Sequence, residues 1–179
     1  MIIFSNKHLH VATLNDVAAI TYLLNSAYRG ENSKKGWTTE AHLIAGNART
    51  NESSIYELIK LPNSIILKYT DEEQPILGCV NLQQQGNKIY LGMLCVSPQT
   101  QGTGIGKQLL KAAEEYAQHL NCVAIYMTVI SVRTELINWY QRYGYKDTGE
   151  RKPFIEDGVS GTHLQPLEFM GLEKVVDHC

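Results

Sequence analysis

Three glycines at alternate positions, Gly102, Gly104 and Gly106, separate an apolar segment of the chain from an amphipathic one. The apolar segment, Lys88–Val96, is rich in residues that favour strands, and apolar side chains recur at helical spacing from Gly104 to about Leu120. Glycine adopts positive φ angles easily and leaves no side chain in the way of a ligand. A strand, a glycine loop and a helix N-terminus in this order favour an anion site, most naturally for a phosphate or pyrophosphate.

The spacing of the glycines excludes two common phosphate-binding motifs. No G-x-x-x-x-G-K-[ST] pattern precedes Lys107, and Gly106 comes one residue too early for G-x-G-x-x-G. The residues of the loop alone therefore leave two interpretations: a phosphate site of another kind, or a glycine-rich turn without a ligand.

The pattern of the whole chain predicts one domain over residues 1–179, because it contains no repeat, low-complexity tract or linker. Helices are expected over Asp16–Arg29, from about Thr39 to Ile44, and over Ser53–Leu61, Gly104–Leu120 and Arg133–Arg142. Strands are expected over His8–Leu14, Ser64–Tyr69, Ile76–Gln83, Lys88–Val96, Cys122–Ile130, Lys146–Glu150 and Leu164–Val176, with a loop over 31–36 and a turn over 71–74. This order predicts an α/β (α+β) fold, with a mixed, mostly antiparallel central sheet and helices on both faces.

Composition excludes several classes of protein. Sixteen Lys and Arg residues stand against eighteen Asp and Glu, a formal charge of −2, which argues against a nucleic-acid partner. No run reaches the roughly 18 apolar residues of a membrane helix. The four cysteines are widely spaced, and the six histidines have no metal-binding spacing. We therefore expect no disulfide framework, no metal site, and a reducing, cytoplasmic location.

The loop Gln101-Gly102-Thr103-Gly104-Ile105-Gly106 resembles the [QR]-x-x-G-x-[GA] motif of the GCN5-related N-acetyltransferases, the GNAT superfamily. The resemblance implies that backbone amides of the loop bind the pyrophosphate of acetyl-CoA, and that the preceding strand pairs with the pantetheine arm and directs an amide at the thioester. It also places Gly92 near a bulge that separates this strand from Cys122–Ile130. The implied coenzyme-binding residues are Leu94, Cys95, Val96, Gln101, Gly102, Thr103, Gly104, Ile105, Gly106 and Lys107.

A second segment, Trp139-Tyr140-Gln141-Arg142-Tyr143-Gly144-Tyr145, resembles the F-Y-x-x-x-G-[FY] segment of the same family. The resemblance implies that Tyr140 faces the coenzyme sulfur and acts as the general acid. A tyrosine pKa near ~10 suits a donor to a thiolate whose conjugate acid has a pKa near ~8.5. The alternative is a core aromatic beside Leu136 and Ile137. The glycine loop and this segment occur in the same order as in the family, which favours the catalytic role over the core role.

The chain also departs from the family pattern. Arg133 stands where many members have an asparagine that touches pantetheine, and its role is open. Residues 91–96 hold no carboxylate, so the general base comes from elsewhere or is water. Cys95 is expected to be a buried hydrophobe rather than an acyl-carrying nucleophile.

Three residues lie in the region where the family usually builds its acceptor site: Glu31, Trp37 and Glu40. We take them as candidate substrate residues. A solvated residue at a helix start is the more common explanation for a glutamate placed as Glu40 is, and Trp37 fits a cap on the core equally well.

The resemblance implies an acetyl-CoA-dependent N-acetyltransferase that transfers the acetyl group directly to a primary amine of a small molecule or peptide. The rival interpretation is a non-catalytic sensor module that binds acyl-CoA, and the missing strand carboxylate favours it. Either protein is expected to be a monomer or homodimer.

Overall fold

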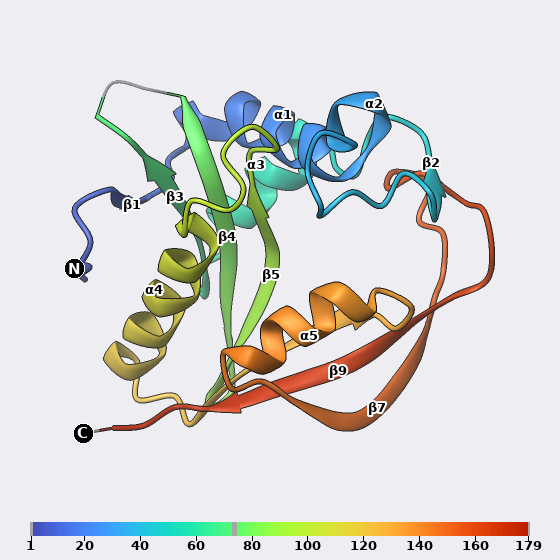
Figure 1. The fold of residues 1–179 in the computed structure, drawn as a ribbon. Helices are drawn as coiled ribbons and strands as arrows, with labels where there is room; N and C mark the ends of the chain where they lie inside the picture. Colours follow the sequence, from blue (N-terminus) through green and yellow to red (C-terminus); the bar gives the residue numbers. More distant parts are fainter. Residues whose placement is uncertain (1, 73–74, 179) are drawn as a thin grey trace.

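The computed structural model describes residues 2–72 and 75–178. Within them, seven strands form the main sheet in the order β1-β3-β4-β5-β6-β9-β7 (Figure 1). Their bounds are β1 (Leu9–Val11), β3 (Ser64–Thr70), β4 (Ile76–Gln85), β5 (Lys88–Val96), β6 (Ala124–Ile130), β7 (Lys146–Phe154) and β9 (Leu167–Val175). Strands β5 and β6 run parallel, and the other neighbouring pairs are antiparallel. The expected mixed, mostly antiparallel sheet is confirmed.

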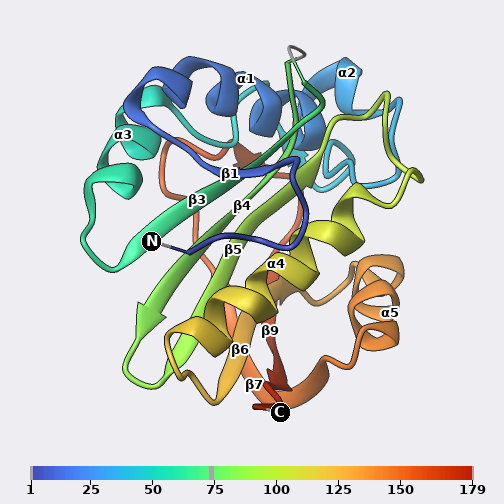
Figure 2. The same ribbon diagram turned by 90° about the vertical axis from the view of Figure 1, so that its left-hand side faces the viewer.

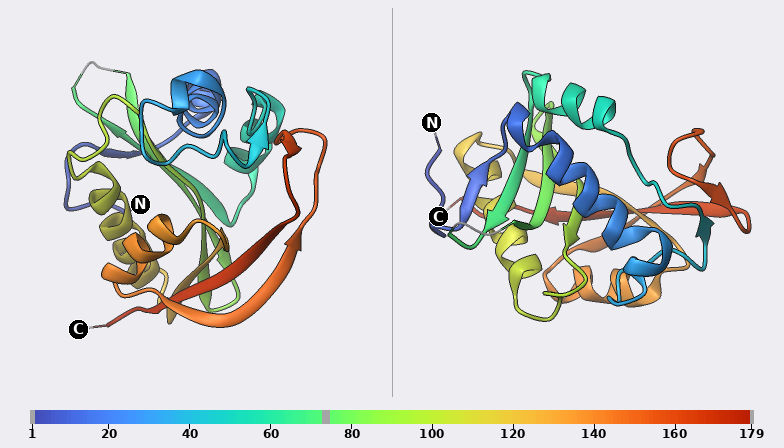
Figure 3. Two further views of the ribbon diagram at one scale, coloured as in Figure 1. Left: turned by 45° about the vertical axis from the view of Figure 1, so that its right-hand side comes forward. Right: turned by 90° about the horizontal axis from the view of Figure 1, so that it is seen from above.

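Helices cover both faces of the sheet, as expected (Figures 2 and 3). They are α1 (Val17–Tyr28), α2 (Gly30–Ser33), α3 (Glu52–Lys60), α4 (Ile105–His119) and α5 (Thr134–Arg142), with a 3-10 turn at Leu14–Asp16 before α1. Alternate strand residues point to opposite faces. Ile66 and Cys79 pack with α1 and α3, whereas their neighbours Leu67 and Val80 pack with α4 and α5.

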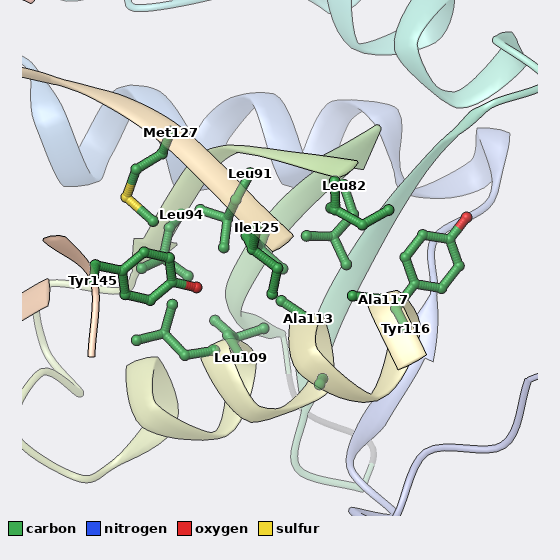
Figure 4. Close-up of a cluster of buried hydrophobic side chains, with 14 of the residues drawn as sticks. Leu82, Leu91, Leu94, Leu109, Ala113, Tyr116, Ala117, Ile125, Met127 and Tyr145 are labelled. Atoms are coloured by element: carbon green, nitrogen blue, oxygen red, sulfur yellow. The ribbon is translucent and has the colours of Figure 1, made fainter. Parts of the chain in front are cut away.

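The larger core lies between α4 and the sheet. Figure 4 shows Leu109 and Ala113 of α4 against Leu82, Leu91 and Ile125 of three strands. All five side chains are almost completely buried. This packing anchors the start of α4, and with it the glycine loop, on the end of β5.

The sheet opens between β5 and β6. The two strands pair from Lys88 to Tyr90 only, and they diverge beyond that point. Strand β5 carries one extra residue here, because Cys79 of β4 pairs with Cys95 while Asn81 pairs with Gly92. Met93 has φ 55 at this point. Such a bulge bends and twists its strand, and its expected position near Gly92 is confirmed.

Two local predictions in the segment after α1 are wrong. The expected loop over 31–36 contains α2, and the expected helix from Thr39 to Ile44 is a turn followed by β2 (Ile44–Ala45), which pairs with β8 (Thr162–His163). The physical reason is tertiary packing: Leu43 and Ile44 bury against Ile130 and Leu167 of the main sheet. Strand β8 is also unpredicted, because it lies where a loop was expected. The other elements agree with expectation within a few residues, and the expected turn over 71–74 lies partly outside the described residues.

Candidate active site

Two cavities lie at the opening of the sheet. The first, of about 280 Å³, lies between the diverging strands and is lined by residues 91–94 and 127–130; we call it the split cavity. The second, of about 650 Å³, lies between the glycine loop, the end of β5 and α5; we call it the loop cavity. Four residues line both cavities: Tyr28, Leu94, Leu136 and Tyr140. A molecule extending from one cavity into the other passes these side chains.

The glycine loop presents backbone donors to the loop cavity. Gly102 and Gly104 have φ 82 and 89, angles that glycine adopts without strain. The amide of Gln108 donates to the carbonyl of Gly104 at 3.1 Å, so the amides of Ile105 and Gly106 precede the first bond of α4 and have no acceptor within the helix. A Cβ at Gly102 or Gly104 would meet nothing within 4 Å. The loop is therefore open on this side, and its amides and helix dipole suit an anion.

Most of the predicted coenzyme-binding residues line the loop cavity: Leu94, Cys95, Val96, Gln101, Gly102, Gly104, Ile105 and Gly106. Thr103 and Lys107 are not among the residues lining it. The hydroxyl of Thr103 donates instead to the carbonyl of Thr100 at 2.6 Å and closes the turn.

The side chain of Gln101 ties the loop to the segment before it. Its Oε1 accepts from the amide of Trp37 at 2.8 Å, and its Nε2 donates to Thr38 Oγ1 at 2.8 Å and to the carbonyl of Val96 at 3.1 Å. Gly36 is needed beside it, because a Cβ there would lie 2.4 Å from Gln101 Oε1. Gln101 therefore fixes the shape of the loop through its side chain.

Aromatic side chains form the α5 wall of the loop cavity. Trp139 lies 5.0 Å from Tyr143 and 6.2 Å from Trp37, measured between ring centroids. A Cβ on Gly106 would approach the Trp139 ring to 3.1 Å, so a glycine lets α4 and α5 meet closely. Trp37 lines the loop cavity and not the split cavity.

Tyr140 lies at the junction of the two cavities and is 5% exposed. Its hydroxyl makes no hydrogen bond to any residue in the described part of the chain. Burial raises its pKa above the ordinary value, and the charges of Arg133 and Arg49 oppose that rise. The phenol therefore stays protonated and is free to donate to a group in either cavity.

Tyr28, the last residue of α1, also lines both cavities, and the sequence did not predict it as a site residue. Its hydroxyl donates to the carbonyl of Leu94, and the Arg49 guanidinium lies 4.3 Å from its ring centroid. Burial raises the pKa of Tyr28 well above its ordinary value. Only its position on the apolar face of α1 is visible in the sequence, and that position is equally typical of a core tyrosine.

Glu40 is buried between two arginines rather than solvated at a helix start. Its Oε1 accepts from Arg29 Nη1 at 2.8 Å, and its Oε2 lies 3.4 Å from Arg133 Nη1. Arg133 also donates to the carbonyl of Thr38 at 2.9 Å. These bonds join the start of α5 to the segment that holds Glu40. Arg133 itself lines the split cavity and not the loop cavity.

Glu31 is not brought to either cavity. Its side chain is 88% exposed and pairs with Lys34 on the surface of α2. Cys95 is buried as expected, with its Sγ 3.6 Å from that of Cys79 on the adjacent strand. Among the described residues, no group of three or more His, Cys, Asp or Glu side chains is placed to hold a metal ion. None of the described helices has the length and apolar character needed to cross a membrane.

The fold and the site define the class: an α/β domain with an open mixed sheet, a glycine loop before α4, and two adjoining cavities that meet at a buried tyrosine. Residues 38–166 match the family model described as an acetyltransferase (GNAT) domain. The chain therefore belongs to the GNAT acetyltransferase family.

Relatives of known activity are distant. The chain is 30% identical over 67 residues to a spermine/spermidine N(1)-acetyltransferase of Bacillus subtilis, covering 37% of this chain and 44% of the relative. It is 27% identical over 82 residues to a thialysine N-epsilon-acetyltransferase of Mus musculus, covering 46% and 48%. The matched segments thus span about half the length of these relatives.

Similarity in structure extends over almost the whole chain. The ribosomal-protein-S18-alanine N-acetyltransferase from Escherichia coli aligns over 96% of this chain and 94% of its own, with a TM-score of 0.70 at 10% identity. At that identity the similarity establishes the fold and leaves the acceptor open.

Proposed function

We propose that this chain is an acetyl-CoA-dependent N-acetyltransferase that moves the acetyl group directly from the coenzyme to a primary amine. The observation that carries the proposal is the meeting of the two cavities at Leu94 and Tyr140. A thioester held at this junction lies between a donor site on one side and an acceptor site on the other. One sequence relative is named for spermine and spermidine and the other for thialysine, and both names agree with an amine acceptor.

The loop cavity is the coenzyme site in this proposal. The amides of the glycine loop and the N-terminus of α4 hold the pyrophosphate, and these neutral donors provide the positive potential that a chain of net charge −2 otherwise lacks. The end of β5 pairs with the pantetheine arm. Its direction aims the thioester at the junction, where Leu94 and Tyr140 line both cavities.

The reaction needs no covalent enzyme intermediate. The amine attacks the thioester carbonyl, a C–N bond forms, the C–S bond breaks, and the electron pair of that bond leaves on sulfur. A backbone amide near Leu94 to Val96 stabilises the oxyanion, and the Tyr140 hydroxyl donates its proton to the departing thiolate. A raised pKa keeps this phenol protonated at neutral pH.

The split cavity holds no free carboxylate base among the described residues. Glu40 is held by two arginines, and Asp157 accepts from the amides of Val159 and Ser160 at 2.8 and 2.7 Å. The hydrogen bonds that Asp157 accepts lower the pKa of its carboxyl group, and the bond from the Ser160 amide has the largest effect. The nearby guanidinium groups disfavour a protonated amine, so the acceptor reacts as the neutral amine and releases its proton to water.

The test is an assay of purified protein with acetyl-CoA and a panel of primary amines. Thiol release is followed together with mass spectrometry of the amine. We expect an acetylated amine in amounts equal to the free CoA formed. Tight binding of acetyl-CoA with no transfer to any amine in the panel would support the sensor interpretation instead. Glu31→Gln, which lies outside both cavities, is the control for handling and folding.

A further inference from the structure

The charged side chains of the split cavity are unusual for a site that receives a polyamine. Three guanidinium groups, from Arg29, Arg49 and Arg133, line it together with the carboxylates of Glu40 and Asp157. Cationic amines are repelled by such a wall, whereas an anionic group is attracted. The next question is which guanidinium group is free to bind an anion.

Two of the arginines are occupied by the protein itself. Arg29 is 3% exposed and donates to Glu40 and, through Nε, to the carbonyl of Ser160 at 2.9 Å. Arg133 is 8% exposed and pairs with Glu40 and the carbonyl of Thr38. The Glu40 carboxylate is thus shared between both, and their donors serve to hold the cavity wall together.

Arg49 is different. Its guanidinium group makes no hydrogen bond or ion pair with the described residues, and the guanidinium carbon lies over the Tyr28 ring at 4.3 Å from the centroid. A cation–π contact uses none of the N–H donors, so all five are left for another partner. A planar guanidinium with free donors in a cavity matches a carboxylate in two-point geometry.

The backbone beneath Arg49 is held in place. The Asn25 side chain of α1 accepts from the amides of Arg49 at 2.7 Å and Thr50 at 3.0 Å, and it donates to the carbonyl of Thr50 at 3.2 Å. Thr50 is itself buried. Three hydrogen bonds to one side chain thus fix the residue that carries the guanidinium, which is what a built anion site requires.

Arg49 is also close to the reaction centre. The Tyr28 ring separates its guanidinium group from Leu94, because that ring stacks on Arg49 and its hydroxyl bonds to the Leu94 carbonyl. An acceptor that reaches from Arg49 to the thioester therefore has its anionic group and its amine only a few bonds apart. The rest of the cavity wall is mixed: Met127, Val129 and Phe169 are apolar, and Thr50, Thr128 and Ser160 carry hydroxyl groups.

We infer that Arg49 binds the anionic group of the acceptor, and that the acceptor is a small amino acid-like molecule whose carboxylate, or similar oxyanion, lies a few bonds from its primary amine. This inference rests on the proposed function and names its substrate class. It differs from what the name of the Bacillus subtilis relative describes, because spermine and spermidine carry no anion. Thialysine, named for the Mus musculus relative, is an amino acid, but its ε-amine lies further from its carboxylate than the class inferred here.

The first experiment compares acceptors that differ in the anion alone. Leucine is paired with isoamylamine and phenylalanine with phenethylamine, and the aminophosphonate analogues, spermidine and a leucine-initiated dipeptide complete the panel. We expect kcat/KM for the anionic member to exceed that of its uncharged partner by about 10- to 100-fold, the scale of charge-assisted hydrogen bonds. The phosphonates distinguish a carboxylate from a phosphoryl site. Preference for spermidine, the dipeptide or the decarboxylated amines overturns the inference and leaves the acetyltransferase proposal standing.

The second experiment assigns the effect to Arg49. Arg49→Met keeps the side chain's length without its charge, and Arg49→Lys keeps the charge without the planar fork. The ratio of kcat/KM between paired acceptors should fall toward one in Arg49→Met and partly in Arg49→Lys. Arg151→Met, which removes an equal charge from β7 outside both cavities, should keep the ratio. An unchanged ratio in both Arg49 variants, with normal coenzyme affinity as proof of folding, overturns the assignment.

A binding measurement separates this inference from the proposed function. CoA-loaded protein is titrated by calorimetry with N-acetyl-leucine and with N-isoamylacetamide, which requires no turnover. Tighter binding of the carboxylate, lost in Arg49→Met, supports the anion site even if no amine is acetylated. Equal or undetectable binding of both compounds contradicts it even if acetylation occurs.

Discussion

Tyr140 owes its proposed role to its position rather than to its residue type. Ten tyrosines occur in the chain, and Tyr28 and Tyr140 are the two that line both cavities. Tyr28 uses its hydroxyl to hold the Leu94 carbonyl, whereas that of Tyr140 is unengaged among the described residues. This difference assigns a structural part to one phenol and leaves the other available for proton transfer.

Replacing Tyr140 by phenylalanine removes the proton donor and keeps the ring. We expect kcat to fall by roughly 10²-fold, the usual contribution of a general acid, while the Kd for CoA changes little. Steady-state kinetics and calorimetry measure the two quantities. The matched control is Tyr116→Phe on α4, which lies outside both cavities and should retain turnover. Undiminished turnover in Tyr140→Phe at saturating substrate would remove Tyr140 from the mechanism.

Glu40 and Glu31 are both candidate substrate residues in the sequence, and the structure places them in different surroundings. Glu40→Gln leaves two buried guanidinium groups without their counter-charge, so we expect the free energy of unfolding to fall by about 3–5 kcal/mol. Glu31→Gln breaks only an exposed pair and should change neither stability nor KM measurably. Urea unfolding of both variants measures this. Equal stability of the two would contradict a structural role for Glu40.

Residues that act locally were predictable from the sequence, and residues assembled by the tertiary fold were not. The glycine loop and Tyr140 belong to contiguous segments whose spacing is visible in the chain. Arg49 and Tyr28 meet only because α1 and the segment after β2 pack together over the opening of the sheet. No periodicity relates these two positions, so no sequence pattern could pair them.

At the scale of elements, the glycine loop depends on backbone conformation as much as on space. Gly104 precedes α4 with φ 89, and a Cβ there meets no protein atom within 4 Å. Gly104 also lines the loop cavity. In this structure the requirement for glycine comes from the positive φ and not from protein neighbours.

Replacing Gly104 by valine should weaken both folding and coenzyme binding. A β-branched residue at positive φ destabilises the fold by about 1–2 kcal/mol, and loss of phosphate hydrogen bonds should raise the Kd for CoA roughly 10- to 100-fold. Gly86→Val is the matched control, because Gly86 has φ 62 in the turn between β4 and β5 and equally open surroundings. It should lose similar stability and bind CoA normally. Equal CoA affinity in Gly104→Val would contradict the pyrophosphate site.

Helices and strands with strong periodicity were predicted well, and the weak segment between α1 and α3 was not. In α4 the apolar stripe alone identifies the helix, because one face packs on the sheet. Residues 39–44 carry no comparable stripe. Burial of Glu40 and pairing of β2 with β8 decide their conformation, and both depend on residues far away in the chain.

At the scale of the molecule, the opening of the sheet connects fold and function. One extra residue in β5 and the early end of its pairing with β6 create the split cavity. The same divergence exposes the end of β5 to the loop cavity. One opening in the sheet therefore adjoins both cavities.

Buried phenols make the whole molecule sensitive to alkaline pH. Burial raises the pKa values of Tyr28, Tyr140 and Tyr145 above the unfolded value near ~10. Above that pH the unfolded chain loses these protons and the native chain keeps them, so stability falls as pH rises, by up to about 1.4 kcal/mol per pH unit for each group. Unfolding midpoints in urea from pH 8 to pH 11 measure the slope.

Tyr145→Phe isolates one of these contributions. The Tyr145 hydroxyl is buried and makes no hydrogen bond within the described residues, so the variant should be as stable as the parent at pH 7 or more stable. Above pH 10 its free energy of unfolding should fall less steeply with pH than that of the parent, by the contribution of one tyrosine. Identical slopes for parent and variant would show that Tyr145 ionises in the native state.

The most direct test of the whole account is the position of acetyl-CoA in a crystal structure of the complex. We expect the pyrophosphate at the amides of Gly102 to Lys107, and the thioester sulfur within about 3–3.5 Å of the Tyr140 hydroxyl. The acetyl group should point into the split cavity. A coenzyme bound with its thioester outside the junction of the two cavities would contradict the account.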